Sequence, residues 1–112
     1  MRAYELMVIH DGDLDDVAVQ DELKDVRSRV ESVGQLHSVD FWGRRRFAYE
    51  IDHKQEGYYS VLELLAEPGA MDPVERALRI ADNVVRHKLI RLPESEAERR
   101  GMMGDGDSAS AE

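Results

Sequence analysis

The feature that most constrains the fold is an alternation of two residue periods along the first 92 residues. Segments 3–10, 36–51, 58–66 and 84–92 have the patterns of β-strands. Between them, segments 14–33 and 72–83 repeat apolar residues at helical spacing. The order β-α-β-β-α-β is the split βαβ pattern of a ferredoxin-like α+β sandwich. It predicts a four-stranded antiparallel sheet with two helices on one face and leaves the other face open.

The strand patterns indicate where two of the strands lie. Segment 3–10 is largely apolar on both faces, which is typical of a central strand. In segment 36–51, Gly43 predicts a bulge or kink, and the polar residues 54–57 predict a turn that closes a long hairpin. Large apolar residues share one parity of segment 36–51, and these are Val39, Phe41, Phe47, Tyr49 and Ile51.

Capping signals predict the ends of both helices. Asp13 is expected as the N-cap of a helix over 14–33, with Gly34 as its left-handed C-cap. Asp72, before a proline, is expected to cap the second helix, and Asn83 to end it in the left-handed conformation. The stripes expected to face the sheet are Val19, Leu23, Val26, Val30 and Val33, and then Val74, Ala77, Leu78 and Ala81.

Composition predicts one domain over 1–92 and an acidic, disordered tail over 93–112. The chain has no cysteine, which excludes disulfides and fits a reducing compartment. It shows neither an apolar run of membrane-spanning length nor the apolar core of a signal peptide. A soluble, cytoplasmic protein is therefore expected.

The charge is unevenly distributed. The formal net charge is −9, and the tail contributes −4 of it through six acidic and two basic residues. Against this background stand the basic block Arg44 to Arg46 and the basic residues between Arg79 and Arg91. Arginine beside aromatic residues suits phosphate groups and unpaired bases. The overall acidity therefore does not exclude a basic, nucleic-acid-binding face.

Enzyme and metal motifs are weak or missing in the sequence. Asp11, Asp13, Asp15 and Glu22 match part of a calcium loop, but Asp16 replaces its required glycine. The four histidines do not form a metal pattern with one another. We find neither a catalytic triad nor a glycine-rich phosphate loop. The sequence predicts a non-enzymatic protein with no metal and no cofactor.

Residue chemistry alone leaves two interpretations open for each of two features. The block Arg44 to Arg46 suits either a solvated strand edge that blocks strand pairing or a polyanion-binding surface. Trp42 suits either hairpin packing or a platform at a partner surface.

Four groups of residues, in order, carry a resemblance to a known family: Met1-Arg2-x-Tyr4-Glu5, Trp42-Gly43-x-Arg45-x-x-Ala48-Tyr49-x-Ile51, Gly57-Tyr58, and Leu78-Arg79-x-x-Asp82-x-Val84-x-Arg86. Together they resemble the ribosomal protein S6 family of the bacterial small subunit, over about residues 1–92. The ferredoxin-like fold that this resemblance implies agrees with the element order above.

The resemblance implies a structural role in the cytoplasmic ribosome. It implies binding to the central domain of the small-subunit rRNA, together with ribosomal protein S18, during assembly, with neither DNA nor a membrane as a partner. A basic partner is also expected on electrostatic grounds, because a chain of charge −9 repels RNA. The implied RNA-side residues are Arg2, Arg44, Arg45, Arg46, Arg86 and Lys88, and the implied partner-side residues are Trp42, Tyr58 and Tyr59.

Two other function classes use the same fold. A homodimeric regulatory module that binds a small ligand is the alternative, and a stable homodimer on sizing would favour it. An acylphosphatase-like enzyme needs an arginine in a phosphate-binding loop after the first strand. That loop is Asp11-Gly12-Asp13 here, which would repel phosphate.

Overall fold

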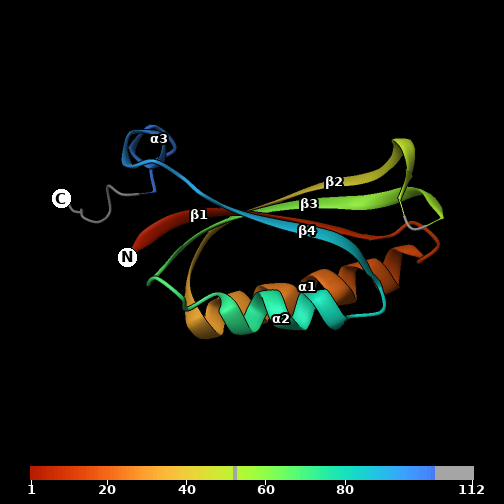
Figure 1. Cartoon of the computed structure of the whole chain (residues 1–112), viewed down its shortest axis with the longest axis horizontal. Helices are drawn as coiled ribbons and strands as arrows, with labels where there is room; N and C mark the ends of the chain where they lie inside the picture. Colours follow the sequence, from red (N-terminus) through yellow and green to blue (C-terminus); the bar gives the residue numbers. More distant parts are fainter. Residues whose placement is uncertain (52, 103–112) are drawn as a thin grey trace.

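Two helices, α1 and α2, cover one face of a four-stranded antiparallel sheet in the order β2-β3-β1-β4 (Figure 1). The computed structural model describes residues 1–51 and 53–102. The arrangement confirms the predicted ferredoxin-like sandwich. The elements are β1 (Arg2–Asp11), α1 (Asp16–Val33), β2 (Gly34–Ile51), β3 (Lys54–Ala66), α2 (Asp72–Ile80), β4 (Val84–Arg91) and α3 (Glu94–Arg99).

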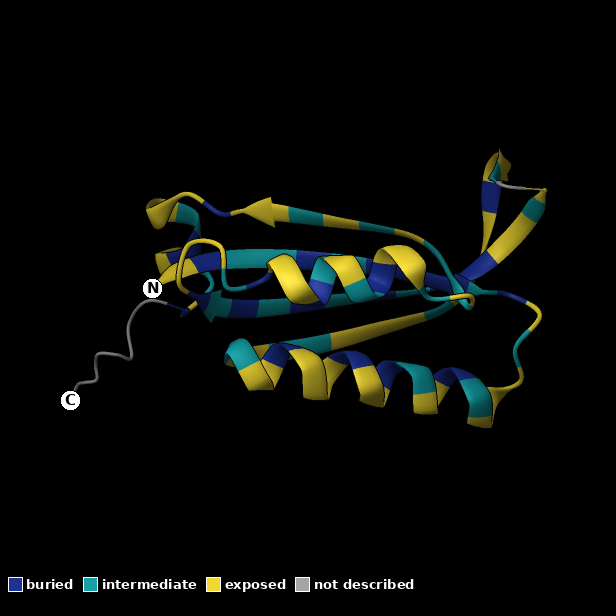
Figure 2. Cartoon of the chain, turned by 60° about the horizontal axis from the view of Figure 1, so that its bottom comes forward, coloured by how far each residue is buried: buried dark blue, intermediate teal, exposed yellow. Residues whose placement is uncertain are grey.

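The core lies between the sheet and the two helices. The strand β1 pairs with β3 on one side and β4 on the other, which confirms the predicted central strand. The apolar stripes of α1 and α2 face the sheet, as the buried positions in Figure 2 show. Burial of these side chains is the main stabilising contribution to the fold. The core residues are Leu6, Val8, Leu23, Val26, Val30, Leu62, Leu64, Ala66, Met71, Val74 and Leu78.

The start of α1 differs from the prediction. The helix begins at Asp16, and Asp15 is its N-cap, accepting a hydrogen bond at 2.8 Å from the backbone N–H three residues later. The prediction of Asp13 as the cap was wrong: Asp13 lies in the preceding turn, where its N–H donates to the Asp11 carboxylate at 2.9 Å and its own carboxylate lies 3.7 Å from the Lys54 Nζ. Leu14 and Asp15, which were predicted to be helical, therefore precede the helix.

Both ends of α2 also differ from the prediction. Asp72 is the first helical residue, and Met71 occupies the N-cap position without a side-chain capping bond, so the predicted cap was one residue late. The helix ends at Ile80, and Asn83 does not adopt the left-handed conformation expected of it. The Asn83 amide instead donates to the Glu22 carboxylate at 3.0 Å and links this loop to α1.

Gly34 has a role other than the predicted left-handed cap. Its φ of −163° is extended backbone, and it is the first residue of β2. A Cβ atom at this position would lie 2.4 Å from the Leu65 carbonyl oxygen and 3.1 Å from the Ala66 Cβ. Glycine therefore serves the close approach of β2 to β3 where α1 ends.

Gly43 forms the predicted bulge, with a φ of +87° and a shift in the β2–β3 register after Phe41. Beyond the bulge, the β2 side chains of a given parity point to the opposite face of the sheet. Phe41 stacks on Tyr58 on the helix-covered face, whereas Phe47 packs edge-on against Tyr59 on the opposite face. The large apolar residues that share one parity in the sequence therefore lie on two different faces of the sheet.

The first ten residues of the predicted tail, 93–102, include the helix α3. There α3 lies against the sheet on the face opposite α1 and α2 (Figure 1). Ala97 is 0% and Met102 1% exposed, in a small cluster with Ala3 and Leu92. Residues 103–112, which complete the predicted tail, lie outside the described residues. Of the helices that the structure describes, none is long and apolar enough to cross a membrane.

Candidate functional site

The sheet face opposite α1 and α2, called the open face from here on, carries the candidate site. The β2–β3 hairpin curls toward this side at one end of the sheet, and α3 covers the other end (Figure 1). Between them lies a hollow of about 310 Å³. It is lined by Met7, Ile9, Phe47, Ala48, Tyr49, Ile51, Tyr59, Arg86, His87 and Lys88.

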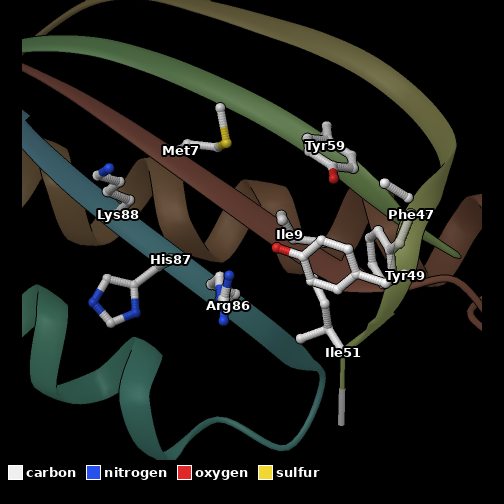
Figure 3. A pocket seen from close by; sticks show the side chains of 10 residues that line it. Met7, Ile9, Phe47, Tyr49, Ile51, Tyr59, Arg86, His87 and Lys88 are labelled. Atoms are coloured by element: carbon white, nitrogen blue, oxygen red, sulfur yellow. The ribbon is translucent and has the colours of Figure 1, made fainter. Parts of the chain in front are cut away.

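The hollow combines aromatic rings with two cations (Figure 3). Arg86 pairs with Ile9 and Lys88 with Met7 in the β1–β4 register, so both basic side chains stand on the open face. The residue between them, His87, points to the other side, where its Nε2 lies 3.2 Å from a Glu75 carboxylate oxygen. A hollow of this kind can hold an apolar side chain and neutralise a nearby anion.

A second aromatic group stands beside the hollow. Trp42, 42% exposed, stacks on Tyr59 with 5.8 Å between ring centroids and 7° between planes. The Trp42 indole N–H donates to the Asp40 carboxylate at 3.0 Å. Arg45 lines the same surface as this ring pair. Trp42 is therefore a partly exposed platform on the hairpin and lies outside the core. We call Trp42 and Tyr59 the aromatic platform.

Arg44 is placed on the helix-covered side, apart from Arg45. Its Nη2 donates to the Tyr58 hydroxyl at 2.6 Å, its guanidinium lies 5.0 Å from the Tyr58 ring centre, and its Nε lies 4.0 Å from Glu56. The hydrogen bond to Tyr58 is the main reason why the pKa of Arg44 is raised. Arg44 is therefore engaged within the chain, and its charge is shared with Glu56.

Tyr58, predicted as a partner-side residue, is buried on the helix-covered face. It is 4% exposed, and its hydroxyl donates to the Leu14 carbonyl oxygen at 3.0 Å while accepting from Arg44. Tyr58 therefore joins the β1–α1 loop to the hairpin. Tyr59, the next residue, faces the open side.

The structure does not bring all six predicted RNA-side residues together. Arg45, Arg86 and Lys88 share the open face. Arg46 lies on the hairpin, where its Nη2 is 3.4 Å from the Gln55 side-chain oxygen. Arg2 is opposite Ala66 and therefore lies at the far end of β3 from the hairpin.

Sequence reasoning missed a charged cluster on the open face beneath α3. Arg100 Nη1 donates to Glu5 at 2.9 Å and to Glu63 at 3.0 Å, and its Nε donates to Glu96 at 2.7 Å. Ser38 donates to Glu63 at 2.7 Å. The hydrogen bonds to Glu5 and Glu96 raise the pKa of Arg100, and the hydrogen bond from Arg100 lowers the pKa of Glu96. The strand register and the packing of α3 on the sheet place these groups together, so no sequence motif could have shown them.

These observations define a class of protein: a ferredoxin-like binding domain whose helix layer holds the fold and whose open sheet face carries aromatic and basic side chains. Within residues 1–51 and 53–102, no three His, Asp or Glu side chains are grouped to hold a metal ion.

The family model described as Ribosomal protein S6 matches residues 3–91. The chain belongs to the ribosomal protein S6 family and is thus a protein of the small ribosomal subunit.

Individual relatives agree with this assignment. The chain is 46% identical to the small ribosomal subunit protein bS6 of Streptomyces griseus over 92 residues, which are 81% of this chain and 96% of the relative. It is 45% identical to the bS6 protein of Salinispora arenicola, with the same coverage of both chains. The crystal structure of 30S ribosomal protein S6 from Thermotoga maritima superposes with a TM-score of 0.82 at 25% identity, covering 89% of this chain and 95% of that one.

The comparisons confirm the family resemblance and the ferredoxin-like fold. The relatives are structural ribosomal proteins, which confirms the expectation of a non-enzymatic role. Membership of this family places the chain in the ribosome of the bacterial cytoplasm.

Proposed function

We propose that the chain binds the central domain of the small-subunit rRNA as a pair with ribosomal protein S18, and that the open face contacts S18. The observation that carries this proposal is the aromatic platform of Trp42 and Tyr59 beside the apolar hollow. Exposed aromatic residues next to a concave apolar surface are typical anchors of protein interfaces. On the helix-covered face, Phe41 is 38% exposed, but the Tyr58 ring on which it stacks is buried.

Electrostatics support a pair over a single RNA-binding chain. The net charge of −9 opposes approach to a polyanion. A basic partner on the open face would offset that charge and leave the exposed arginines of the hairpin arm at the edge of the pair. Arg45 and Arg46 are the strongest RNA-side candidates of the basic block, because Arg44 already shares its charge with Glu56. Arg2 remains an RNA-side candidate at the far end of β3, and Arg86 and Lys88 remain candidates at the hollow on the open face.

Binding to an rRNA central-domain fragment tests the proposal directly. The affinity is measured for the chain alone, for S18 alone and for the two together. We expect the pair to bind more tightly than S18 alone, and the chain alone to bind weakly. Trp42 is the single tryptophan of the chain, so its emission reports the docking of a tryptophan-free S18 without RNA. A pair that binds no better than S18 alone would contradict the proposal.

The salt dependence of the same measurement tests the basic block. Replacing Arg44, Arg45 and Arg46 by alanine should lower the slope of log affinity against log salt by roughly 0.7–0.9 for each phosphate group that the variant no longer neutralises. The matched control replaces the exposed Lys24, Arg27 and Arg76 of the helix layer by alanine, with the same change in net charge. Equal effects of the two triple variants would mean that charge alone matters, and an unchanged slope in the first would mean that the block does not bind RNA.

A further inference from the structure

The segment α3 covers one end of the surface proposed to contact S18. It lies on the open face, opposite the helix layer (Figure 1). It also lies beyond residues 3–91, the part that matches the family model, whereas Glu5 and Glu63 beneath it lie within that part. The isolated chain therefore shields part of its own family-matched face with a later segment.

The charged part of the attachment of α3 is a single cation, Arg100, that bonds to two strand carboxylates. Glu5 and Glu63 are direct neighbours across β1 and β3, and like charges in such a pair repel each other. The guanidinium of Arg100 lies between them and bonds to both. Their side chains are about one-fifth exposed, so the repulsion is only partly screened by water. Without Arg100, the two carboxylates would form a strong local attraction for another cation.

The apolar part of the attachment is small. Ala97 and Met102 bury themselves against Ala3 and Leu92, with Leu65 packed at the margin, in a cluster separate from the main core. A helix of six residues has little stability of its own. Segments held by few apolar contacts open at low free-energy cost compared with global unfolding. This segment is therefore suited to leave the sheet while the fold stays intact.

We propose that α3 is a displaceable cover, and that Glu5 and Glu63 receive a basic side chain of S18 when Arg100 leaves. This inference rests on the proposed function, since it concerns the same open face. Charge complementarity selects the occupant, because a partner that offsets the −9 charge of this chain must bring cations. When α3 leaves, the apolar side chains of Ala3 and Leu65 become exposed together with the two carboxylates. They would then pack against the same partner segment.

The matched pair of variants is Arg100→Gln and Arg99→Gln in the full chain. Arg99 is on the same helix, its side chain is 75% exposed, and it bonds to Glu96 and not to the two strand carboxylates. Both variants lose one positive charge, so non-specific attraction of a basic partner changes equally. We expect Arg100→Gln to bind S18 roughly five- to thirty-fold more tightly than Arg99→Gln, because a closed cover reduces the binding-competent fraction.

Two further measurements separate the parts of the inference. Amide hydrogen exchange of α3 should be faster in Arg100→Gln than in Arg99→Gln, and equal exchange would mean that Arg100 does not hold the cover. In the Arg100→Gln chain, the added change Glu63→Gln should weaken S18 binding several-fold. Unchanged binding there would mean that the carboxylate does not receive the partner.

The outcomes also distinguish this inference from the proposed function. If the unaltered chain binds S18, and Arg100→Gln binds S18 no more tightly than Arg99→Gln, the proposal that α3 is a cover would be wrong. The proposed pairing with S18 would then still stand. Absence of S18 binding in the unaltered chain and in both variants would overturn both. Binding only after Arg100→Gln would support both.

Discussion

Tyr58 and Tyr59 are neighbours in β3 and show how differently the two faces of the sheet use one residue type. Tyr58, on the helix-covered face, is 4% exposed, and its hydroxyl both accepts and donates a hydrogen bond. Tyr59, on the open face, stacks under the partly exposed Trp42 and lines the hollow. The first ring is part of the fold, and the second is available to a partner. The same division runs through the whole sheet: one face is a buried apolar core, and the other is aromatic and charged.

The largest expected effect is the loss of a core side chain from the helix-covered face. Leu62 is 0% exposed, and Leu62→Ala should lower the free energy of unfolding by about 2–5 kcal/mol. The control is Tyr49, which is 75% exposed on the hairpin. Tyr49→Ala should change the free energy of unfolding by less than about 0.5 kcal/mol. Urea unfolding of both variants measures the difference. Similar losses at the two sites would contradict the division between the faces.

A smaller effect is expected where the helix layer joins the sheet. Gly34→Ala would place a Cβ 2.4 Å from the Leu65 carbonyl oxygen, and the resulting shift should cost about 1–3 kcal/mol. Gly43→Ala meets no atom within 4 Å and carries only the strain of its φ of +87°, of about 1–2 kcal/mol. Thermal unfolding compares the two. If Gly43→Ala lowered the stability clearly more than Gly34→Ala, the close approach of β2 to β3 at Gly34 would be contradicted.

The two tyrosines give the next test. Tyr58→Phe removes a hydroxyl that joins Arg44 to the Leu14 carbonyl oxygen, so it should cost about 1 kcal/mol of stability. Tyr59→Phe should cost less than about 0.5 kcal/mol, because the structure shows no hydrogen bond to its hydroxyl from a described residue. Conversely, Tyr59→Ala should weaken S18 binding. Chemical denaturation and the Trp42 emission titration measure the two properties on the same samples.

The smallest expected effect is a pH dependence from a single buried group. His10 is 0% exposed on the helix-covered face, and burial lowers its pKa, although the attraction of Glu22 partly opposes this. Below its ordinary pKa of 6.5, the unfolded chain binds a proton that the folded chain binds only at lower pH. Stability should therefore fall as the pH drops below 6.5 and show no loss from this group above it.

Urea unfolding between about pH 7 and about pH 5.5 checks this dependence. His10→Gln should remove part of the slope, and Glu22→Gln should make the slope steeper, because it removes the carboxylate 3.9 Å from the His10 Nε2. If His10→Gln left the slope unchanged, another group would be responsible.

The order of helices and strands could be predicted from the sequence because apolar residues repeat with a different period in each type of element. The stripe from Val19 to Val30 and the alternation around Leu6 depend on neighbours in the chain, and both were found buried where expected. The cap of α1 was misplaced by two residues because Asp13 and Asp15 have the same chemistry. The loop hydrogen bond of Asp11 decides between them.

The candidate site was only partly predictable. The sequence indicated an arginine block beside Trp42, but the bulge at Gly43 determines that Arg44 lies on the helix-covered face and Arg45 on the open face. The sequence also did not show which of Tyr58 and Tyr59 faces the helices, because that depends on how the sheet packs and not on the strand alone.

The sequence alone determined the ferredoxin-like order, the family resemblance and the acidity that favours a basic partner, because these depend on local periods, residue identity and summed charge. Tertiary structure alone decided which side chains share the open face, and that Arg100 lies between Glu5 and Glu63, residues 95 and 37 positions away from it. Strand register and the packing of α3 bring these groups together, and such long-range contacts leave no period or motif in the chain.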